Sequence, residues 1–286
     1  MKIAVTSASG QLGAAIVKTL ITEIGKDNVI AIARTPEKAK HLGVEVRKGD
    51  YNSREDFNIA LKDVDAVLLV SGMDEPQKRI QQHRNVIEAA TYNSVQKIVY
   101  TSIVGDDINT AFSPIVQSNR QTEEDVSTSG LDWVIGRNGI YIEPDLEYLD
   151  TYIKEGEIRN CANEGKCGYT SREELGVAYA QMLLSDKHNG NTYNLVGEAI
   201  TQTQLAAYIN QVFGTNLKYV AVSVDEYKTE RQAALGDFIG TVIAGIYEGI
   251  KSGVNNVPSD YKKAAGRSHI SPLQMIQDYQ LKHSTK

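Results

Sequence analysis

The sequence predicts an α/β protein built on a doubly wound parallel sheet. Short apolar runs alternate with segments of helical spacing through the first half of the chain. These runs are nearly continuous in apolar residues, which is typical of strands that are covered on both faces. The first run, residues 2–6, ends in a turn of small residues that leads into a helix. Strand, tight turn and helix in this order are typical of a Rossmann domain.

The elements of the first half follow the order that such a sheet requires, because strands and helices alternate and right-handed crossovers then wind the sheet in both directions. The predicted strands are residues 2–6, 28–33, 44–47, 65–70, 97–101 and 131–135. The predicted helices are residues 11–24, 54–62, 76–92 and 115–129.

The alternation of strand and helix ends after Asn138. Helices are predicted over residues 144–154, 172–185, 202–213 and 272–282, and strands over residues 192–196 and 217–222. We therefore predict a Rossmann domain over residues 1–138 and a smaller α/β lobe on the substrate side over residues 139–286. The sequence leaves open whether the second part crosses back into the sheet.

Composition excludes several classes of partner. The 286 residues carry a net charge of −6 without clusters of basic residues, so no nucleic-acid partner is expected. No apolar run approaches the roughly 20 residues that cross a bilayer, and the chain begins with a strand instead of a signal-peptide pattern. Cys161 and Cys167 lack neighbouring histidines, so neither a metal site nor a disulfide is expected. We expect a cytoplasmic monomer or homodimer without a membrane partner.

The turn after the first strand has the features of a phosphate-binding turn. Gly10 and Gly13 have the spacing of the second and third glycines of a dinucleotide fingerprint, and Ser7 replaces the first. Small side chains let phosphates approach the backbone, and the helix that begins there offers free N–H groups to an anion. An ordinary turn between strand and helix is the alternative. The residues expected to contact the cofactor here are Thr6, Ser9, Gly10, Gln11 and Leu12.

The end of the second predicted strand indicates which cofactor is bound. NAD-selective sites have Asp or Glu at this position. Here Arg34 follows the strand, with Lys38 one helical turn later. Because a guanidinium suits a 2′-phosphate through charge and paired N–H donors, we predict NADP(H) as the cofactor, bound by both residues. The alternative is that Arg34 is a solvated loop charge.

The ends of the later strands supply further candidates, because ligands of doubly wound sheets bind beyond the carboxyl ends of the strands. Asp50 is expected to accept a hydrogen bond from an adenine amino group. Ser71 and Gly72 are expected to border the ribose or the pyrophosphate. A plain turn residue is the alternative for all three. Ser102 and Asn138 complete the set of cofactor contacts.

The fifth strand and the helix after it indicate the available chemistry. Short-chain dehydrogenases use a Ser at the end of this strand and a Tyr-x-x-x-Lys pair on the helix for proton transfer. Ser102 fits the Ser, but the predicted helix contains neither Tyr nor Lys. Ketones and alcohols need a proton handled together with the hydride, whereas a reduced quinone or dye collects protons from water. The sequence therefore favours such an acceptor. His83 is expected to be a packed residue.

The chain resembles the NmrA-like branch of the atypical short-chain dehydrogenases, and within it the type 2 NAD(P)H:quinone oxidoreductases and the triphenylmethane reductases. Members of these groups also lack the Tyr and the Lys. The resemblance spans nearly the whole length and is carried by residues 10–13 (GQLG), 29–38, 82–87 (QHRNVI), 100–102 (YTS), 137–141 (RNGIY) and 192–195 (TYNL).

The resemblance implies NADPH held by the Gly10 turn and Arg34, and a pocket between the lobes for a flat acceptor. It also implies positions for residues of the second half. Beside the nicotinamide and the acceptor it places Asn138, Gly139 and Tyr141, and at the lobe junction it places Tyr169 and Arg172.

Two positions depart from the pattern of the resembling proteins. Ser7 replaces the first glycine of the turn, and Asn119 stands where the quinone reductases tend to have His. Both departures bear on ligand binding, the first on the pyrophosphate and the second on the acceptor.

Two functions from different classes fit these observations. The first is an NADPH-dependent oxidoreductase that transfers a hydride to a quinone or similar aromatic acceptor without a Tyr/Lys proton relay. Its candidate catalytic residues are Ser102, Asn138 and Tyr141, and its candidate substrate residues are Asn138, Tyr141 and Tyr169. The second is a redox sensor that binds NADP(H) without turnover. A sugar-nucleotide epimerase is disfavoured, because such enzymes need the Tyr.

Overall fold

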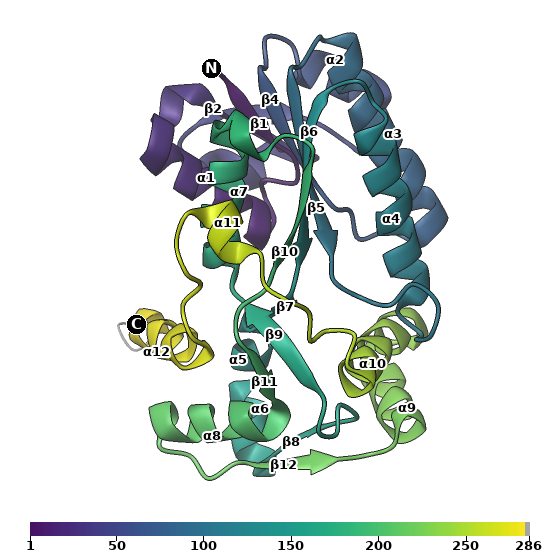
Figure 1. Cartoon of the computed structure of the whole chain (residues 1–286), viewed down its shortest axis with the longest axis vertical. Helices are drawn as coiled ribbons and strands as arrows, with labels where there is room; N and C mark the ends of the chain where they lie inside the picture. Colours follow the sequence, from purple (N-terminus) through teal and green to yellow (C-terminus); the bar gives the residue numbers. More distant parts are fainter. Residues whose placement is uncertain (284–286) are drawn as a thin grey trace.

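The computed structural model describes residues 1–283 of the chain. Its largest element is a parallel sheet of seven strands, seen nearly edge-on in Figure 1. The doubly wound sheet predicted from the sequence is confirmed, with a seventh strand beside the six expected ones. From edge to edge the strands are β10 (Asn191–Leu195), β6 (Asp132–Asn138), β5 (Lys97–Ile103), β4 (Ala66–Val70), β1 (Ile3–Val5), β2 (Val29–Ala33) and β3 (Glu45–Lys48).

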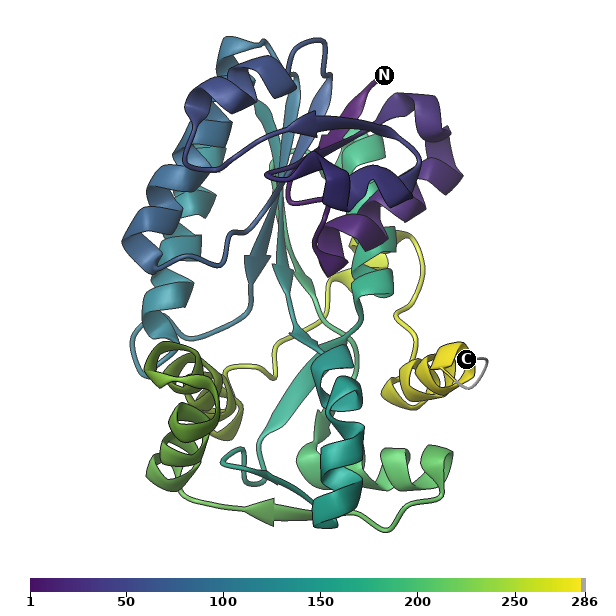
Figure 2. The ribbon, with the colours of Figure 1, turned by 180° about the vertical axis from the view of Figure 1, so that it is seen from behind.

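Helices cover both faces of this sheet (Figures 1 and 2). One face carries α1 (Gln11–Ile24), the 3-10 helix η2 (Pro36–Leu42), α7 (Arg172–Leu184) and α11 (Tyr261–Ala265). The other face carries α2 (Arg54–Ala60), α3 (Pro76–Tyr92) and α4 (Ser113–Ser127). Every residue of β1, β2 and β4 is buried, as expected for strands covered on both sides. The 3-10 turns η1 (Lys26–Asn28) and η3 (Asp186–His188) are short connections.

Local signals fix where several helices begin and end. Ser53 and Ser171 each accept a hydrogen bond from the backbone N–H three residues later, as N-caps of α2 and α7. The acidic residues three positions after these two serines bind other groups. Asp56 accepts a hydrogen bond from the backbone of Asp50, and Glu174 forms an ion pair with Arg267. Each cap therefore has the serine half of a capping box without the acidic half.

The second half of the chain returns to the layers of the main sheet twice, first with α7 and β10 and later with α11. After β6 the chain forms short strands and helices below the sheet, and α7 then packs against α1 while β10 pairs with β6. The close approach of α7 to α1 needs a glycine, because a Cβ at Gly176 would lie 2.8 Å from Thr19 Oγ1. Residue 138 is thus the last residue of β6, and residues 172–195 belong to the layers of the main sheet.

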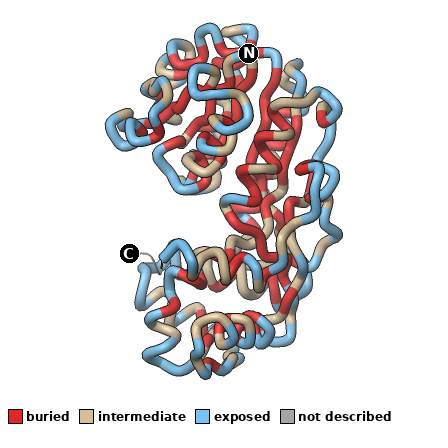
Figure 3. The backbone as a smooth tube through the Cα atoms, turned by 90° about the vertical axis from the view of Figure 1, so that its left-hand side faces the viewer, coloured by how far each residue is buried: buried red, intermediate tan, exposed pale blue. Residues whose placement is uncertain are grey.

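The remaining elements form a second body around its own core (Figure 3). One small sheet contains β11, β9 and β7, and another contains β12 and β8. The strands are β7 (Ile140–Tyr141), β8 (Glu157–Asn160), β9 (Lys166–Thr170), β11 (Ala199–Thr201) and β12 (Lys218–Ala221). The helices are α5 (Glu143–Glu147), α6 (Leu149–Glu155), α8 (Gln202–Phe213), α9 (Val224–Leu235), α10 (Asp237–Ser252) and α12 (Pro272–His283).

The structure corrects the sequence prediction in this second body. The single helix predicted over residues 144–154 is interrupted at Tyr148, which separates α5 from α6. Strands β7, β8, β9 and β11 were not predicted, because each has only two to five residues and pairs with segments distant in sequence. In the described part of the chain, no helix is long and apolar enough to cross a bilayer.

Candidate cofactor and acceptor site

The turn between β1 and α1 is tight because Ser7 itself adopts the left-handed conformation. Its φ is +50°, a region that glycine enters most easily and that costs another residue about 1 kcal/mol. The turn is closed by a hydrogen bond from Gly10 N–H to Ser7 O of 2.9 Å. A Cβ at Gly13 would lie 2.5 Å from Ser7 O, so only glycine lets α1 approach the turn this closely. Ser7 therefore provides the backbone geometry usually provided by a first glycine.

The first backbone N–H groups of α1 are free of side-chain caps. Gly10 is the N-cap and has no side chain, and the first turn of α1 contains no acidic residue. Ser9, Gly10 and Gln11 are exposed, whereas the side chain of Leu12 packs in the core, so that only the backbone of Leu12 faces the turn. Free N–H groups and the positive end of the helix dipole make this turn suitable for an anion.

Thr6 lies beneath the turn and is fully buried. Its Oγ1 accepts a hydrogen bond from Val70 N–H at 2.9 Å and lies 2.6 Å from the hydroxyl of Tyr51. Tyr51 in turn donates to Val70 O at 2.5 Å, and burial raises its pKa to about 12. The side chain of Thr6, predicted to contact the cofactor, thus connects β1 to β4.

Cationic side chains without protein partners follow β2. Arg34 and Lys38 are exposed, and within residues 1–283 their side chains form neither hydrogen bonds nor ion pairs. Asp74, in the loop after β4, lies within the field of Arg34. A hydrogen bond from Gln82, with further contributions from Lys78 and from the charge of Arg34, holds the pKa of Asp74 below its usual range.

Asp50 lies at the same edge of the sheet, after β3. One of its carboxylate oxygens accepts hydrogen bonds from the backbone and the side-chain amide of Asn52, both at 2.9 Å. The turn interpretation of Asp50 is therefore supported by its contacts. The second oxygen accepts no hydrogen bond from residues 1–283 and is free to accept one from a ligand.

The loop after β4 is held by buried side chains. Ser71 N–H donates to Thr101 Oγ1 at 2.8 Å, and Gly72 N–H donates to His83 Nε2 at 2.9 Å. Because Nε2 accepts, the ring proton of His83 lies on Nδ1, which is 2.9 Å from Thr122 Oγ1. Burial and the charge of Arg79 lower the pKa of His83 to about 3, so the ring is neutral. His83 is a packed residue that positions the Ser71–Gly72 loop.

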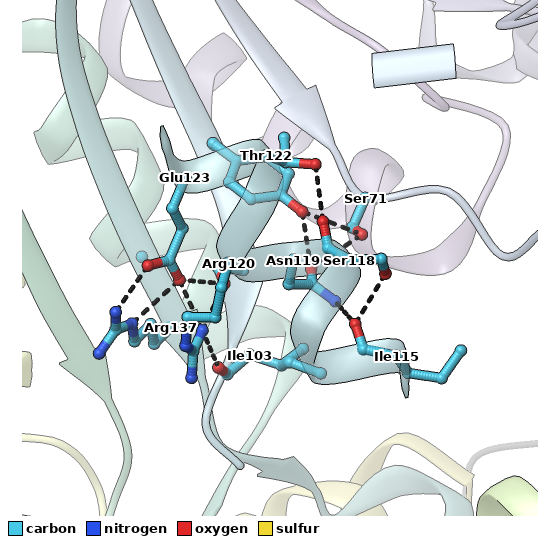
Figure 4. A network of polar contacts seen from close by, with 12 residues as sticks. Ser71, Ile103, Ile115, Ser118, Asn119, Arg120, Thr122, Glu123 and Arg137 are labelled. Atoms are coloured by element: carbon cyan, nitrogen blue, oxygen red, sulfur yellow. Dashed lines mark hydrogen bonds and ion pairs between the residues drawn. The ribbon is translucent and has the colours of Figure 1, made fainter. Parts of the chain in front are cut away.

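Asn119 of α4 occupies the position beside β5 where the resemblance suggested His. Its Oδ1 accepts hydrogen bonds from the hydroxyls of Tyr100 at 2.7 Å and Ser71 at 3.2 Å, and its Nδ2 donates to Ile115 O at 2.8 Å (Figure 4). Burial raises the pKa of Tyr100 well above its ordinary value. This cluster is neutral, and the hydroxyl protons of Tyr100 and Ser71 point toward the asparagine.

Glu123, Arg120 and Arg137 form an ionic cluster on the other side of α4 (Figure 4). Ser102 is buried beside this cluster. Its hydroxyl donates to Glu123 Oε1 at 2.5 Å and accepts from Arg120 at 3.2 Å. Arg137 binds both oxygens of Glu123, at 3.0 and 2.6 Å. Burial favours the neutral acid, but the hydrogen bonds from Arg137 and Ser102 outweigh it and hold the pKa of Glu123 below its usual range. The hydroxyl proton of Ser102 is therefore committed to a carboxylate.

Asn138 and Tyr141 form a third hydrogen-bonded group at the end of β6. Tyr179 donates to Asn138 Oδ1 at 2.6 Å, and Asn138 Nδ2 donates to the Tyr141 hydroxyl at 2.9 Å. The Tyr141 hydroxyl oxygen accepts the hydrogen bond from Asn138, and its own hydrogen has no partner among residues 1–283. Burial raises the pKa of Tyr141 to about 12, and the guanidinium of Arg172 lies 5.9 Å from its ring centre.

Tyr169 and Arg172 have different surroundings, although the sequence placed both at the lobe junction. Tyr169 is fully buried in the core of the second body, where its hydroxyl donates to Asp145 at 3.0 Å and accepts from Gln202 at 3.0 Å. Arg172 lies at the junction and forms an ion pair with Glu147 at 2.9 Å.

A cavity of about 270 Å³ opens at this junction. It extends from Gln11, at the start of α1, to Arg172 and to α12. Glu143 lies in its wall, where Oε1 accepts from the backbone N–H of Arg172 at 2.7 Å and the buried Oε2 has no hydrogen-bond partner among residues 1–283. Burial raises the pKa of Glu143. The cavity therefore extends from the turn before α1 to the second body.

Comparison with known proteins now assigns the family. A family model described as NAD(P)H-binding matches residues 7–183. The chain belongs to the NAD(P)H-binding, NmrA-like family of oxidoreductases. It is 32% identical to quinone oxidoreductase 2 of Escherichia coli over 88% of both chains. It is also 29% identical to an NmrA-like family domain-containing oxidoreductase of Aspergillus flavus, over 96% of this chain and 94% of that one.

A solved structure of a family relative is similar to this one over nearly the whole length. The triphenylmethane reductase of Citrobacter sp. complexed with NADP(H) has a TM-score of 0.88 and 32% sequence identity, covering 97% of this chain and 99% of that one. The expectations of an NmrA-like chain that binds NAD(P)H are confirmed by these comparisons.

The residues at the sheet edge fit the cofactor of this family. Gly10 is exposed and has no side chain, the N-terminus of α1 has no side-chain cap, and within residues 1–283 the side chains of Arg34 and Lys38 form no hydrogen bond or ion pair. The turn would hold the pyrophosphate, and the two cations are suited to a 2′-phosphate. A bound nicotinamide would supply the hydride.

Sequence reasoning about this oxidoreductase missed several residues that organise the site. Tyr51 supports the turn, Tyr179 orients Asn138, and Glu123 binds Ser102. Each acts through a partner at least 21 residues away, and no local spacing marks such a pair. The only available sign was the large number of tyrosines, 15 against one tryptophan and four phenylalanines, but a count does not place them.

Proposed function

We propose that this oxidoreductase transfers a hydride from NADPH to a quinone or a similar conjugated acceptor without a Tyr/Lys proton relay. The observation that carries the proposal concerns the positions at which short-chain dehydrogenases have the Ser, Tyr and Lys of their proton relay. Helix α4 contains no Tyr and no Lys, and the hydroxyl proton of Ser102 is committed to Glu123. An acceptor whose reduced form takes protons from water suits a site of this kind. The E. coli and Citrobacter relatives are named for such acceptors, a quinone and a triphenylmethane dye.

The selection of NADPH over NADH is proposed to depend on Arg34 and Lys38. Both are cations without protein partners at the end of β2. A guanidinium can donate two parallel hydrogen bonds to a phosphate, whereas an unmodified ribose offers no anion to it. Asp74 lies in the field of Arg34 and would oppose a phosphate, so the selection depends on the balance of these charges.

The acceptor is proposed to lie between the sheet edge and the second body, beside Asn138 and Tyr141. The fixed orientation of Asn138 leaves Tyr141 with a free hydroxyl hydrogen, which can be donated to a carbonyl oxygen. Tyr169, also predicted for this role, would influence the acceptor only through the packing of β9 against β7, because its side chain is in the core.

Steady-state assays with purified protein test the proposal. NADPH oxidation should require an added acceptor and should be seen with some members of a panel of benzoquinones, naphthoquinones and cationic dyes. Ser102→Ala is a useful control, because loss of this hydroxyl should affect stability more than the rate of the hydride step. Absence of turnover across the panel would contradict the proposal.

The alternative is a redox sensor that binds NADP(H) without turnover. The neutral cluster of Tyr100, Asn119 and Ser71 favours the sensor, because both hydroxyls there already donate to Asn119 and neither is available to protonate a substrate. A sensor should bind the oxidised and reduced cofactors with clearly different affinities and should capture a protein partner. Calorimetry with NADP⁺ and NADPH, together with the assays above, distinguishes the two functions.

A further inference from the structure

One arginine at the carboxyl edge of the sheet is buried without a partner. Arg79 lies in the first turn of α3, and only 4% of its surface is exposed. Its Nε atom has no hydrogen-bond partner, and within residues 1–283 its guanidinium forms no ion pair or hydrogen bond. An unpaired buried charge costs several kcal/mol of folding free energy. Such a charge is characteristic of a binding site whose ligand is an anion.

The nearby charged groups do not neutralise Arg79. Asp74 and Tyr100 are the groups whose negative charge could act on it. Asp74 already accepts a hydrogen bond from Gln82 at 2.5 Å and lies 3.3 Å from Lys78. Tyr100 is kept neutral by burial, which raises its pKa. Burial lowers the pKa of Arg79, yet an arginine stays protonated near neutral pH, so its positive charge is compensated only in part, through space, by Asp74.

The location of Arg79 separates it from the proposed phosphate sites. The Gly10 turn and Arg34 follow β1 and β2, whereas Arg79 follows β4, on the far side of β1 from β2. Helix α3 also covers the face of the sheet opposite to α1. A dinucleotide lies across the switch point between β1 and β4. With the adenosine half at Arg34, the nicotinamide half and the acceptor fall on the side of Arg79.

We propose that Arg79 binds the anionic oxygen that the acceptor acquires on reduction, an inference that rests on the proposed function. A quinone that takes up a hydride gains one proton and two electrons, the nicotinamide is oxidised, and the product is a hydroquinone monoanion. Water then supplies the second proton. A preformed guanidinium beside the developing anion stabilises it electrostatically in a site with little water. Arg79 thus provides from α3 the positive charge that dehydrogenases of the Tyr-x-x-x-Lys type place on the helix after β5.

Ligand binding tests this proposal without any turnover. Protein saturated with NADP⁺ is titrated calorimetrically with a hydroxynaphthoquinone, which is anionic at neutral pH, and with its neutral methoxy ether. Arg79→Met should weaken binding of the anion by about tenfold or more and leave the ether within about twofold. The matched control is Arg84→Gln, on the same helix, where the guanidinium already forms an ion pair with Asp125 at 2.7 Å. This variant should bind both ligands like the wild type.

Stability and kinetics separate a binding role from a structural one. Arg79→Met should keep or raise the free energy of unfolding, because an unpaired buried charge is removed. The kcat with a neutral quinone should fall on the order of 100-fold while the KM for NADPH changes little. Arg79→Lys should restore part of the anion binding.

Two results would overturn the role of Arg79. If the Met variant bound the anionic quinone unchanged, no such site would exist. If it lost NADP⁺ affinity by the same factor, the guanidinium would belong to a cofactor phosphate. Turnover by the wild-type protein tests only the proposed function, whereas the calorimetric comparison tests the anion site at Arg79 and needs no turnover. Failure of the proposed function can therefore be distinguished from failure of the role of Arg79.

Discussion

Arg34 at the end of β2 and Arg137 at the end of β6 lie at the same edge of one sheet in contrasting surroundings. Arg34 is exposed, and in the described part of the chain its side chain has no hydrogen bond or ion pair. Arg137 is half-buried and binds both oxygens of Glu123, which also accepts from Ser102. The comparison indicates that the β1–β2 region keeps its charges available for a ligand, whereas the β5–β6 region uses its charges to hold the fold together.

Removing the carboxylate from the β5–β6 region is the strongest test of this comparison. Glu123→Gln leaves Arg120 and Arg137 without their counter-charge in a buried setting. The free energy of unfolding in urea should fall by about 3 kcal/mol. The exposed neighbour Glu124 provides the matched control, and Glu124→Gln should change stability by less than about 0.5 kcal/mol. Equal stabilities of the two variants would remove the distinction between the regions.

The corresponding change in the β1–β2 region should affect binding and leave stability unchanged. Arg34→Gln removes an exposed charge that forms no hydrogen bond or ion pair within residues 1–283 and acts on Asp74 only through space, so unfolding should be unaffected within about 0.5 kcal/mol. NADPH affinity should fall by about 2 kcal/mol, the range of a hydrogen bond to a charged group, whereas NADH affinity should stay the same. Fluorescence titration with both cofactors measures this. An equal loss for NADH would show that Arg34 does not contact the 2′-phosphate.

The loop between the two regions should respond to pH through His83. Its pKa is lowered to about 3 in the folded protein, against an ordinary value of 6.5. The unfolded chain therefore binds the proton first, so stability is complete above about pH 6.5 and declines as the pH falls toward 3. Between pH 7 and 5.5 the loss should be about 1 kcal/mol. Urea titrations at several pH values give the free energy of unfolding as a function of pH. This free energy should fall less steeply with falling pH in His83→Gln than in the wild type, and an identical pH dependence would refute this assignment.

Lys38 should give the smallest effect. It is exposed, and solvent screens its charge. Lys38→Gln should weaken NADPH by about threefold, less than Arg34→Gln, and the loss should shrink at high salt. Isothermal titration at two ionic strengths checks both points. A loss larger than that of Arg34→Gln would assign the main phosphate contact to the lysine.

Much of the first half could be predicted from the sequence. The bounds of α1 and α3 agree with the predicted ranges, because an amphipathic helix shows its period within a few turns. The buried strands β2 and β4 were recognised by their apolar runs. The small second body was less predictable. Its strands contain residues such as Lys166, Gly168 and Thr170, and they are defined by pairing with distant segments instead of by their composition.

The candidate site also has features that could be predicted from the sequence and features that could not. The turn at Gly10 and the cations after β2 follow from local sequence, because spacing along the chain places them at the end of a strand. The states of Ser102 and Asn138 do not, since they depend on Glu123 and Tyr179, which lie 21 and 41 residues further along the chain.

The sequence by itself determined the order of strands and helices in the first half of the chain, the tight turn and the kind of cofactor, because periodicity, residue size and charge act over a few neighbouring residues. Only the tertiary structure decided which of the charged and polar groups are satisfied. Arg137 and Glu123 neutralise one another across two elements, whereas Arg34 and Arg79 remain unpaired. Ion pairs and hydrogen bonds extend only a few ångströms, so the three-dimensional fold determines which groups remain free to bind a ligand.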